Sequence, residues 1–328
     1  MAVEVSVIIP AFNCEKTIPA TIHSILTQKT KKSFELIVVD DASTDNTALI
    51  VQRFEKARFF QQEKLGPAHA RNLGAKKADG KLLLFIDADC IANQKWLNEM
   101  ITPFRNRNVS GVQGAYKTAQ REWIARFTQI EIEDRYDLMK ASRNEIDWIG
   151  SYSAGYRKED FFEAGGFDES FPIASGEDPA LSFKISASGK KIIFNQEAIV
   201  YHKHPASFFK YFKTKFFRAF YRIMLYEKFP KKAVKDSYTP QILKIRIILI
   251  WLLLVFLALF QTTKIEIIEF ISILLIMLLL LSTAPFSIKA VKKDLTVGTI
   301  SPAILIARDF IFLLGLIAGT INSLVRRR

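Results

Sequence analysis

The feature that most constrains this chain is its C-terminal quarter, which contains three long apolar runs. Residues 247–260 read IILIWLLLVFLALF, without one polar side chain. A helix needs roughly 20 apolar residues to cross the hydrocarbon core of a bilayer. One such run could be a buried helix of a soluble protein, but three so close together predict a membrane region at residues 241–328. The expected membrane helices cover residues 242–260, 265–286 and 303–325.

The placement of Lys and Arg predicts how these helices are oriented. The segment before the first run is strongly basic, as is Lys289–Lys293 between the second and third. Because basic loops stay on the cytoplasmic side, two spans with both flanks inside fit this pattern. The third run contains Arg308 and Asp309, and a full crossing would carry the basic tail Arg326–Arg328 outside. That run could therefore re-enter, lie at the interface or break the charge rule.

The net charge of +13 is confined to the end of the chain. Residues 1–202 carry 26 Lys and Arg against 27 Asp and Glu, whereas residues 203–240 carry 10 against 2 and residues 241–328 carry 10 against 4. Binding to nucleic acid requires cations that neutralise phosphates, and the first 202 residues have no such excess. We therefore expect anionic membrane lipid, and no nucleic acid, to be the partner of the basic residues.

A basic amphipathic segment, residues 206–229, precedes the first apolar run. Its phenylalanines recur at helical spacing and alternate with Lys and Arg. Such a helix lies among lipid headgroups, with its rings at the acyl boundary and its cations on anionic lipid. A helix packed on a globular domain and a site for single-stranded nucleic acid are the alternatives. Because the segment leads directly into a membrane run, the interfacial helix is the favoured interpretation.

The first two-thirds of the chain alternates short β-branched runs with helical patterns. This βαβα order predicts an α/β fold in which a mostly parallel sheet carries helices on both faces. The expected domains are an α/β domain at residues 1–204, an interfacial segment at 205–240 and the membrane region at 241–328. Strands are expected at residues 5–9, 36–39 and 82–86, and helices at residues 17–28, 45–56, 67–78 and 93–105.

Cysteine content and the N-terminus indicate the compartment. Cys14 and Cys90 are the only cysteines, which excludes a disulfide framework. The first residues, MAVEVSVIIP, lack the basic and long apolar regions of a signal peptide. We therefore expect a multi-pass protein of the cell membrane whose α/β domain faces the cytoplasm.

Polar residues follow the expected strands where each strand ends. Asp40 and Asp41 come after the second strand, and Asp87-Ala88-Asp89 comes after the buried run LLLFI. The carboxyl ends of strands in such sheets form ligand sites. Two carboxylates at positions i and i+2 of a strand face one side and could hold a hard cation such as Mg²⁺ or Mn²⁺. The first strand is followed by Pro10, Ala11, Phe12 and Asn13.

Together these segments resemble the family 2 glycosyltransferases, which have a GT-A fold. The similarity covers about residues 4–204, and the motifs occur in order and at ordinary spacing. Each motif alone is weak, but the set is specific. The matching segments are VSVIIPAFN (5–13), VDDASTDNT (39–47), GPAHARNLG (66–74), FIDADC (85–90), AGGFDE (164–169) and GEDPAL (176–181).

The resemblance implies a nucleotide site at the strand ends. The loop from Pro10 to Asn13 would form its wall, with Phe12 stacking on the nucleobase. Asp41 would hold the nucleobase as well. The nucleoside and its phosphates would be contacted by Asp40, Arg71 and Asp87. The donor would thus be a nucleotide sugar.

The resemblance also implies a metal site and a catalytic base. Asp89, with Asp87 beside it, would bind the divalent metal that bridges the diphosphate, and either His202 or His204 could complete its ligands. Asp178 matches the general base that deprotonates the acceptor hydroxyl, with Glu177 in support. The same two acids would also favour the first turn of a helix, so the two interpretations are compatible. The cations Lys213, Lys215 and Arg218 could hold the diphosphate or an acceptor phosphate.

Departures from related proteins narrow the expected reaction. Processive synthases carry QxxRW before their membrane region, whereas Gln120-Arg-Glu-Trp123 does not match and lies elsewhere. Many relatives have an acid where this chain has Ala180, a departure that concerns the acceptor contacts alone. Dolichyl-phosphate sugar synthases often have Gln where it has Ile91, and this departure, with the missing QxxRW, favours transfer of a single sugar. We therefore expect an inverting, metal-dependent glycosyltransferase that moves one sugar to a lipid-linked or membrane-associated acceptor at the cytosolic face. A polyprenyl-phosphate sugar synthase, a non-catalytic nucleotide-sugar-binding scaffold and a nucleotidyltransferase are the alternatives.

Overall fold

The computed structural model describes residues 3–173 and 175–326, which divide into two compact units. The sheet unit comprises the chain up to Ala119, Tyr136–Lys203 and Asp236–Tyr238. The helical unit comprises Gln120–Arg135, His204–Lys235 and the chain from Thr239 onward. This division differs from the linear boundary expected at residue 204, because part of the expected α/β domain belongs to the helical unit.

One mixed sheet forms the centre of the sheet unit. Its strands are β1 (Val5–Ala11), β2 (Phe34–Asp40), β3 (Ala57–Gln61), β4 (Leu82–Ile86), β5 (Ile91–Ala92), β6 (Val109–Lys117), β7 (Glu145–Ile146), β8 (Ser153–Arg157) and β9 (Lys191–Tyr201). Their order is β3-β2-β1-β4-β8-β6-β9-β5, with β7 paired to β9. The first four are parallel, as the alternating sequence pattern predicts. The other half is mixed, since β8 runs antiparallel to both β4 and β6.

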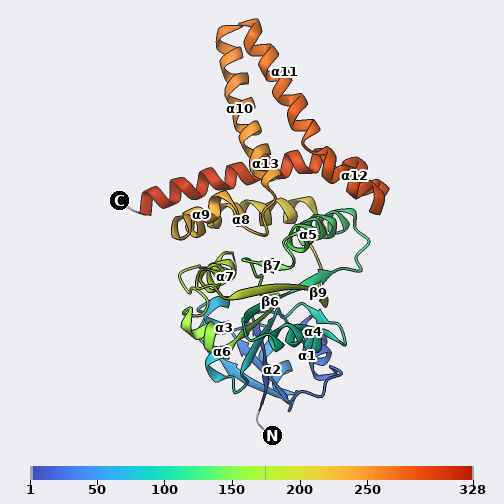
Figure 1. Cartoon of the computed structure of the whole chain (residues 1–328), viewed down its shortest axis with the longest axis vertical. Coiled ribbons are helices and arrows are strands. Elements are labelled where there is room, and N and C mark those ends of the chain that lie inside the picture. Colours follow the sequence, from blue (N-terminus) through green and yellow to red (C-terminus); the bar gives the residue numbers. More distant parts are fainter. Residues whose placement is uncertain (1–2, 174, 327–328) are drawn as a thin grey trace. The chain divides into compact units, whose positions relative to one another are not determined.

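Helices cover both faces of this sheet (Figure 1). They are α1 (Ile18–Leu26), α2 (Thr47–Gln52), α3 (Pro67–Lys77), α4 (Trp96–Ile101), α6 (Lys158–Glu163) and α7 (Glu177–Ala187). Val7 and Ile9 of β1 pack in one core cluster with Ile22 of α1. Ile8 faces the other way, where a Cβ on Gly74 of α3 would lie only 2.5 Å from the Ile8 Cγ2. β1 is therefore buried on both faces, which explains why its sequence is apolar except for the buried Ser6.

The helical unit contains the segments expected at the membrane. Its helices are α8 (Phe208–Lys228), α9 (Pro230–Val234), α10 (Gln241–Thr263), α11 (Glu266–Leu281), α12 (Ala284–Lys293), α13 (Leu295–Arg326) and the part of α5 (Trp123–Ala141) up to Arg135. Among the described residues, three helical stretches are long and apolar enough to cross a bilayer: Gln241–Thr263, Glu266–Lys293 and Leu295–Val325. They coincide with the three apolar runs of the sequence.

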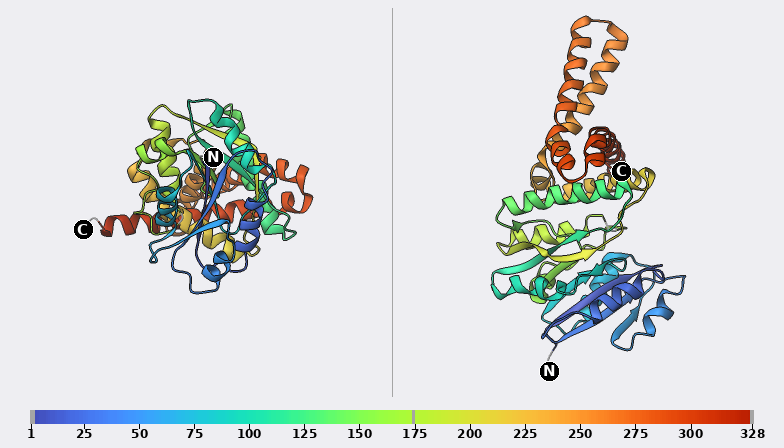
Figure 2. Two further views of the ribbon diagram at one scale, coloured as in Figure 1. Left: turned by 90° about the horizontal axis from the view of Figure 1, so that it is seen from below. Right: turned by 90° about the vertical axis from the view of Figure 1, so that its right-hand side faces the viewer.

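The three long apolar stretches are not arranged alike. Figure 1 shows α10 and α11 side by side as a hairpin, while α13 runs across the base of that hairpin, and the side view in Figure 2 agrees. The second half of α13 packs against α8. A Cβ on Gly315 would lie 2.5 Å from the carbonyl oxygen of Phe216, and one on Gly319 would lie 2.4 Å from that of Phe220. The two glycines therefore allow the backbones of α13 and α8 to approach closely.

Candidate active site

A pocket of about 730 Å³ lies at the carboxyl ends of β1 and β4 in the sheet unit. Its position follows from the topology, because parallel neighbours β1, β2 and β4 end at the same edge of the sheet. Most of the residues expected to bind the nucleotide meet here. Those that line the pocket are Pro10, Ala11, Phe12, Asn13, Asp41, Arg71, Asp87 and Asp89.

The pocket wall after β1 is fixed by hydrogen bonds to the loop after β2. The Asn13 backbone N–H donates to Ser43 Oγ at 2.9 Å, and the Thr44 backbone N–H donates to Asn13 Oδ1 at 2.8 Å. Asn13 adopts a positive φ of 47°, a conformation that asparagine tolerates better than most residues. The two loops therefore form one rigid rim, with Phe12 at its tip.

Phe12 is available for stacking, since 41% of its surface is exposed. The ammonium of Lys64 lies 4.6 Å from the centre of its ring. A cation over an aromatic face is attracted to the ring and can also reach a phosphate or a base carbonyl. The sequence alone does not indicate Lys64, because nothing in the local pattern connects residue 64 with residue 12.

The two aspartates that end β2 have different positions. Asp41 lines the pocket, and its Oδ1 accepts hydrogen bonds from the backbone N–H groups of Leu65 and Gly66 at 2.9 and 3.1 Å. Asp40 is fully buried and is not among the residues that line the pocket. Its carboxylate accepts hydrogen bonds from the backbone N–H of Ser43 and from Gln61. Asp40 therefore has a structural role in the turn after β2, and its expected contact with the nucleoside stays a prediction.

Arg71 connects the pocket with the start of α7. Its buried guanidinium donates to Asp87 Oδ1 and to Glu177 Oε1, each at 2.9 Å. Glu177 is also buried, and its other oxygen accepts hydrogen bonds from the backbone N–H groups of Ser175 and Gly176 at 2.9 and 3.1 Å. Glu177 is therefore a positioning residue that fixes both Arg71 and the first turn of α7.

Asp178, the expected base, is the next residue of that turn. Desolvation of the carboxyl, followed by the nearby charge of Glu177, raises the pKa of Asp178 to about 7. Its Oδ2 accepts a hydrogen bond from the Ser151 backbone N–H at 3.0 Å. This donor acts to lower the pKa of Asp178 but does not cancel the rise. A carboxylate with a pKa near neutrality is well matched to general-base work at physiological pH.

Asp87 and Asp89 face different partners. Asp87 is bound by Arg71, although burial raises its pKa overall. Asp89 Oδ2 lies 3.3 Å from His202 Nε2. Partial burial alone would raise the pKa of Asp89, but the hydrogen bond and charge of His202 outweigh it and hold that pKa below its usual value. Asp89 and His202 therefore form the more open half of the expected metal site.

The two histidines of the His-Lys-His segment have different surroundings. His202 follows β9, and its ring lies against Tyr116 with ring centres 4.8 Å apart. His204 belongs to the helical unit, where its Nε2 is 2.9 Å from Gln129 Oε1 and its side chain is buried. Only His202 lies beside Asp89. Among the described residues, no group of three His, Cys, Asp or Glu side chains is arranged to hold a metal.

The cations of α8 that were expected to bind phosphate differ in their exposure. Lys213 and Arg218 are exposed. Lys215 is buried, and its ammonium lies 2.8 Å from Glu131 Oε2 on α5. Burial lowers the pKa of Lys215 to about 7, although Glu131 acts in the opposite direction. Lys215 therefore forms part of the interior of the helical unit, and its expected contact with the diphosphate or an acceptor phosphate stays a prediction.

An aromatic stack behind His202 is not apparent from the sequence. Tyr116 stacks on Tyr152 with ring centres 3.5 Å apart, and the Tyr136 hydroxyl accepts a hydrogen bond from the Tyr116 backbone N–H at 2.6 Å. Three tyrosines spread over β6, α5 and the segment before β8 share no local motif. They fix Tyr116, and Tyr116 in turn limits the positions open to the His202 ring.

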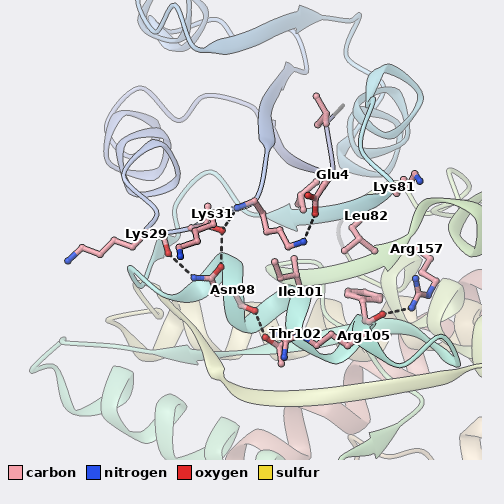
Figure 3. A pocket seen from close by; sticks show the side chains of 15 residues that line it. Glu4, Lys29, Lys31, Lys81, Leu82, Asn98, Ile101, Thr102, Arg105 and Arg157 are labelled. Atoms are coloured by element: carbon pink, nitrogen blue, oxygen red, sulfur yellow. Dashed lines mark hydrogen bonds and ion pairs between the residues drawn. The ribbon is translucent and has the colours of Figure 1, made fainter. Parts of the chain in front are cut away.

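A second, larger cavity of about 1100 Å³ lies at the opposite ends of β1 and β4 (Figure 3). Its floor is apolar, and Lys29, Lys31, Lys81 and Arg105 stand around it. Arg157, which also lines this cavity, donates hydrogen bonds to the backbone carbonyl oxygens of Phe104 and Val109. Among the described residues, the sequence motifs quoted above contribute only Val5, at the start of β1, to this cavity. The candidate active site is therefore the pocket at the carboxyl ends, where those motifs meet.

Comparisons with known proteins match the part of the chain that contains this pocket. Residues 6–164 match the model of glycosyl transferase family 2. The validoxylamine A glucosyltransferase of Streptomyces hygroscopicus subsp. limoneus is 26% identical over 59% of this chain and 50% of its own length. An Escherichia coli enzyme named UDP-Glc:alpha-D-GlcNAc-diphosphoundecaprenol beta-1,3-glucosyltransferase WfgD is 38% identical over 34% of this chain and 46% of its own. The chain thus spans half or less of the length of these relatives.

One solved structure is similar to this chain in fold. The mannosyltransferase PcManGT of Pyrobaculum calidifontis, in complex with GDP-Man and Mn²⁺, superposes with a TM-score of 0.60 at 19% identity. That superposition covers 100% of this chain and 89% of the other. At this identity the likeness concerns the fold alone. Residues 6–164 of the chain are therefore a glycosyl transferase family 2 domain, built on the GT-A fold and followed by apolar helices long enough for a membrane anchor.

Proposed function

We propose that the protein is an inverting glycosyltransferase that moves one sugar from a nucleotide-diphosphate donor to a lipid-linked acceptor at the cytosolic face of the membrane. The observation that carries this proposal is the chain of contacts from Asp87 through Arg71 to Glu177, the residue that precedes Asp178 in the first turn of α7. It joins a nucleotide-sized pocket to a carboxylate whose pKa is about 7. A donor site and a base for the acceptor are thereby fixed to one another.

The donor would bind along the edge formed by β1, β2 and β4. The nucleobase would stack on Phe12, whose exposed ring already attracts the Lys64 ammonium. Asp41 lines the same pocket and shapes it through the backbone of residues 65 and 66. Arg71 and Lys16 are the cations that line this pocket and would meet a diphosphate there. One relative of this domain, WfgD, is named for a UDP-linked glucose donor, which supports a nucleotide sugar as the substrate class.

A divalent metal fits the residues at the pocket mouth. Asp89 Oδ2 and His202 Nε2 lie 3.3 Å apart, close enough to bind one ion together, and the lowered pKa of Asp89 keeps its carboxylate ionised. Mg²⁺ and Mn²⁺ sites of this kind take their remaining ligands from water and substrate phosphates. When bound, such an ion would neutralise the charge of the leaving diphosphate. The Mn²⁺ in the complex of PcManGT supports this assignment.

Asp178 would act on the acceptor. Its carboxylate accepts the proton of the acceptor hydroxyl as that oxygen bonds to the anomeric carbon, while the bond from this carbon to the diphosphate oxygen breaks. The hydrogen bond from Ser151 fixes one carboxylate oxygen and leaves the other for the hydroxyl. Glu177 adds negative charge beside the base and therefore helps to raise its pKa. Attack opposite to the leaving group inverts the anomeric configuration.

The helical unit supports a membrane-bound acceptor. Large apolar side chains of α10 and α11 are exposed along both helices, as lipid-facing residues would be, for example Trp251, Phe270 and Met277. The basic residues of α8 fit anionic headgroups. WfgD is named for an acceptor on a diphosphoundecaprenol carrier, which makes a lipid-linked glycan the favoured acceptor class. A polyprenyl phosphate itself as acceptor is the second candidate.

The packing of α13 favours two crossing helices. Because α13 lies along α8 through Gly315 and Gly319, it would share the interfacial position of that amphipathic helix. Its basic end then stays on the cytoplasmic side, as the charge rule requires. Only α10 and α11 would cross, and both of their flanks would be cytoplasmic. This arrangement is the interfacial option that the sequence left open.

A panel of nucleotide sugars tests the proposed reaction. The full chain in detergent with Mg²⁺ or Mn²⁺ should release nucleoside diphosphate from one donor, and lipid extracts should increase that release. The Asp178→Asn variant should bind the donor but release little product. A catalytically silent scaffold would bind nucleotide without any product, and a nucleotidyltransferase would release pyrophosphate instead.

A further inference from the structure

A small cavity of about 110 Å³ lies in the helical unit, and we call it the base pocket. It is enclosed by parts of α5, α10, α12 and α13, and it also takes in Ser282 at the end of α11. Since a water molecule takes about 30 Å³ of liquid volume, the space suits a group of a few heavy atoms. Three guanidinium groups line it, those of Arg135, Arg246 and Arg308.

The charges around the base pocket do not balance within its buried network. Lys215, Arg246 and Arg308 face only two carboxylates, Glu131 and Asp309. All five side chains are buried. Buried charges are costly unless oppositely charged groups compensate them. When Lys215 is protonated, the network therefore has one cation in excess before Arg135 is considered. Asp134 also lines the cavity but is paired with Lys289, so the balance favours an anion in the adjoining space.

The carboxylates of the network are already fully used. Glu131 accepts hydrogen bonds from Lys215, Arg308, Arg135 and the Tyr211 hydroxyl. Asp309 lies between Arg246 and Arg308. Arginine presents several N–H groups in a planar fork that suits two oxygens of one phosphate. Three such forks around one cavity form a site for a phosphate rather than for a neutral group.

The position of the base pocket indicates where that phosphate would come from. Arg246 lies in the second turn of α10, and Ser282 follows the last residue of α11. Both therefore belong to the open end of the hairpin, opposite the turn that joins its helices (Figure 1). If α10 and α11 cross the bilayer, this end lies at the level of the lipid headgroups.

We propose that the base pocket binds the phosphate group of a membrane lipid, and that this lipid is the phosphate-linked acceptor. The inference rests on the proposed function, because it names the group by which the acceptor would be recognised. A phosphate between Arg135, Arg246 and Arg308 would offset the excess positive charge of the buried network. The lipid chain would then extend along the exposed apolar surface of α10 or α11.

The test uses the full chain in detergent and reads lipid binding as a concentration-dependent rise in melting temperature. The probes are a C55 polyprenyl diphosphate, the C55 alcohol without phosphate, phosphatidylglycerol and inorganic diphosphate. The variant is Arg135→Gln, because Glu131 keeps Lys215 and Arg308 when Arg135 is lost. The matched control is Arg126→Gln on the same helix, whose arginine pairs with Asp294 and does not line the base pocket.

Wild-type protein and the Arg126→Gln variant should be stabilised by the polyprenyl diphosphate at far lower concentration than by the other three probes. Arg135→Gln should weaken that binding about tenfold or more, as expected when a hydrogen bond to a charged group is lost. Equal binding of the C55 alcohol, or equal weakening in both variants, would overturn the proposal. If phosphatidylglycerol bound as tightly as the polyprenyl diphosphate, the assignment of the lipid as the acceptor would be wrong. If inorganic diphosphate bound as tightly, the assignment of the ligand as a lipid would be wrong.

Donor turnover separates this inference from the proposed function. Without acceptor, water can slowly hydrolyse the donor and release nucleoside diphosphate. The residues assigned to the donor lie in the sheet unit, so Arg135→Gln should leave this hydrolysis unchanged. If the wild type binds the polyprenyl diphosphate but cleaves no donor, the proposed function fails while the base pocket stands. If the donor is cleaved but lipid binding is insensitive to Arg135, the base pocket fails while the function stands.

Discussion

Replacing Asp178 with Asn should remove activity and increase stability, and both effects follow from one pKa. The ordinary pKa of 3.8 is raised to about 7 in the folded protein. A tenfold change in a protonation equilibrium corresponds to about 1.4 kcal/mol, so ionised Asp178 destabilises the fold by up to about 4 kcal/mol. Asn has the same shape and can still accept the hydrogen bond from Ser151, but it carries no charge.

The sign of the pH dependence is determined by the raised pKa of Asp178. Between about pH 4 and pH 7 the folded state holds a proton on Asp178 that the unfolded state has lost, so stability falls as pH rises. The Asn variant lacks this contribution. Its advantage in melting temperature should therefore be small at pH 4.5, grow up to pH 7 and remain constant at pH 8.

Activity should change in the opposite sense. The wild-type kcat/KM for nucleoside diphosphate release should rise about tenfold per pH unit below 7, because only ionised Asp178 accepts a proton. Loss of the base should reduce turnover by about 10²- to 10⁴-fold. The reasoning is wrong if the Asn variant keeps turnover within tenfold of wild type, or if its melting temperature follows that of wild type at every pH.

Three further substitutions test the donor site, the metal site and the α13 packing. Phe12→Ala should weaken nucleotide binding, measured by titration calorimetry, about tenfold, since base–aromatic stacking contributes about 1–3 kcal/mol. Lys64→Ala should weaken the binding less, and equal effects of the two variants would contradict the stacking role of Phe12. His202→Ala should raise the Mn²⁺ concentration needed for half-maximal activity by about tenfold or more, whereas His204→Ala should not, because only His202 lies beside Asp89. Gly319→Ala should lower the melting temperature, because its Cβ would overlap the Phe220 carbonyl oxygen, and overpacking of this kind costs about 1–3 kcal/mol; an unchanged melting temperature would contradict the close packing of α13 on α8.

The parts of the fold that depend on local pattern could be predicted from the sequence. The strands β1, β2 and β4 appear as continuous apolar runs because they are buried on both faces. The loops that follow them are polar because they leave the core at the ligand-binding edge. For the same reason the local pattern is enough to indicate the pocket wall at Pro10–Asn13 and the acids Asp87 and Asp89.

Features that depend on contacts between distant residues could not be predicted. In the sequence Lys215 resembles every other cation on a basic helix, and its burial against Glu131 depends on how α5 and α8 pack. His202 and His204 are two residues apart, and only the tertiary structure shows which of them meets Asp89. Asp40 and Asp41 are adjacent, yet one is buried in a turn and the other lines the pocket. Periodicity says which face a residue occupies but not what lies opposite.

The most direct test of the proposed function is to follow the sugar. The full chain in membranes that contain its native lipids would be supplied with nucleotide sugars labelled in the sugar. The structure predicts that the label from one donor moves into the organic extract, with one nucleoside diphosphate released for each sugar transferred and the anomeric configuration inverted. Label that stays in the aqueous phase, a retained configuration, or release of pyrophosphate would contradict the proposed function.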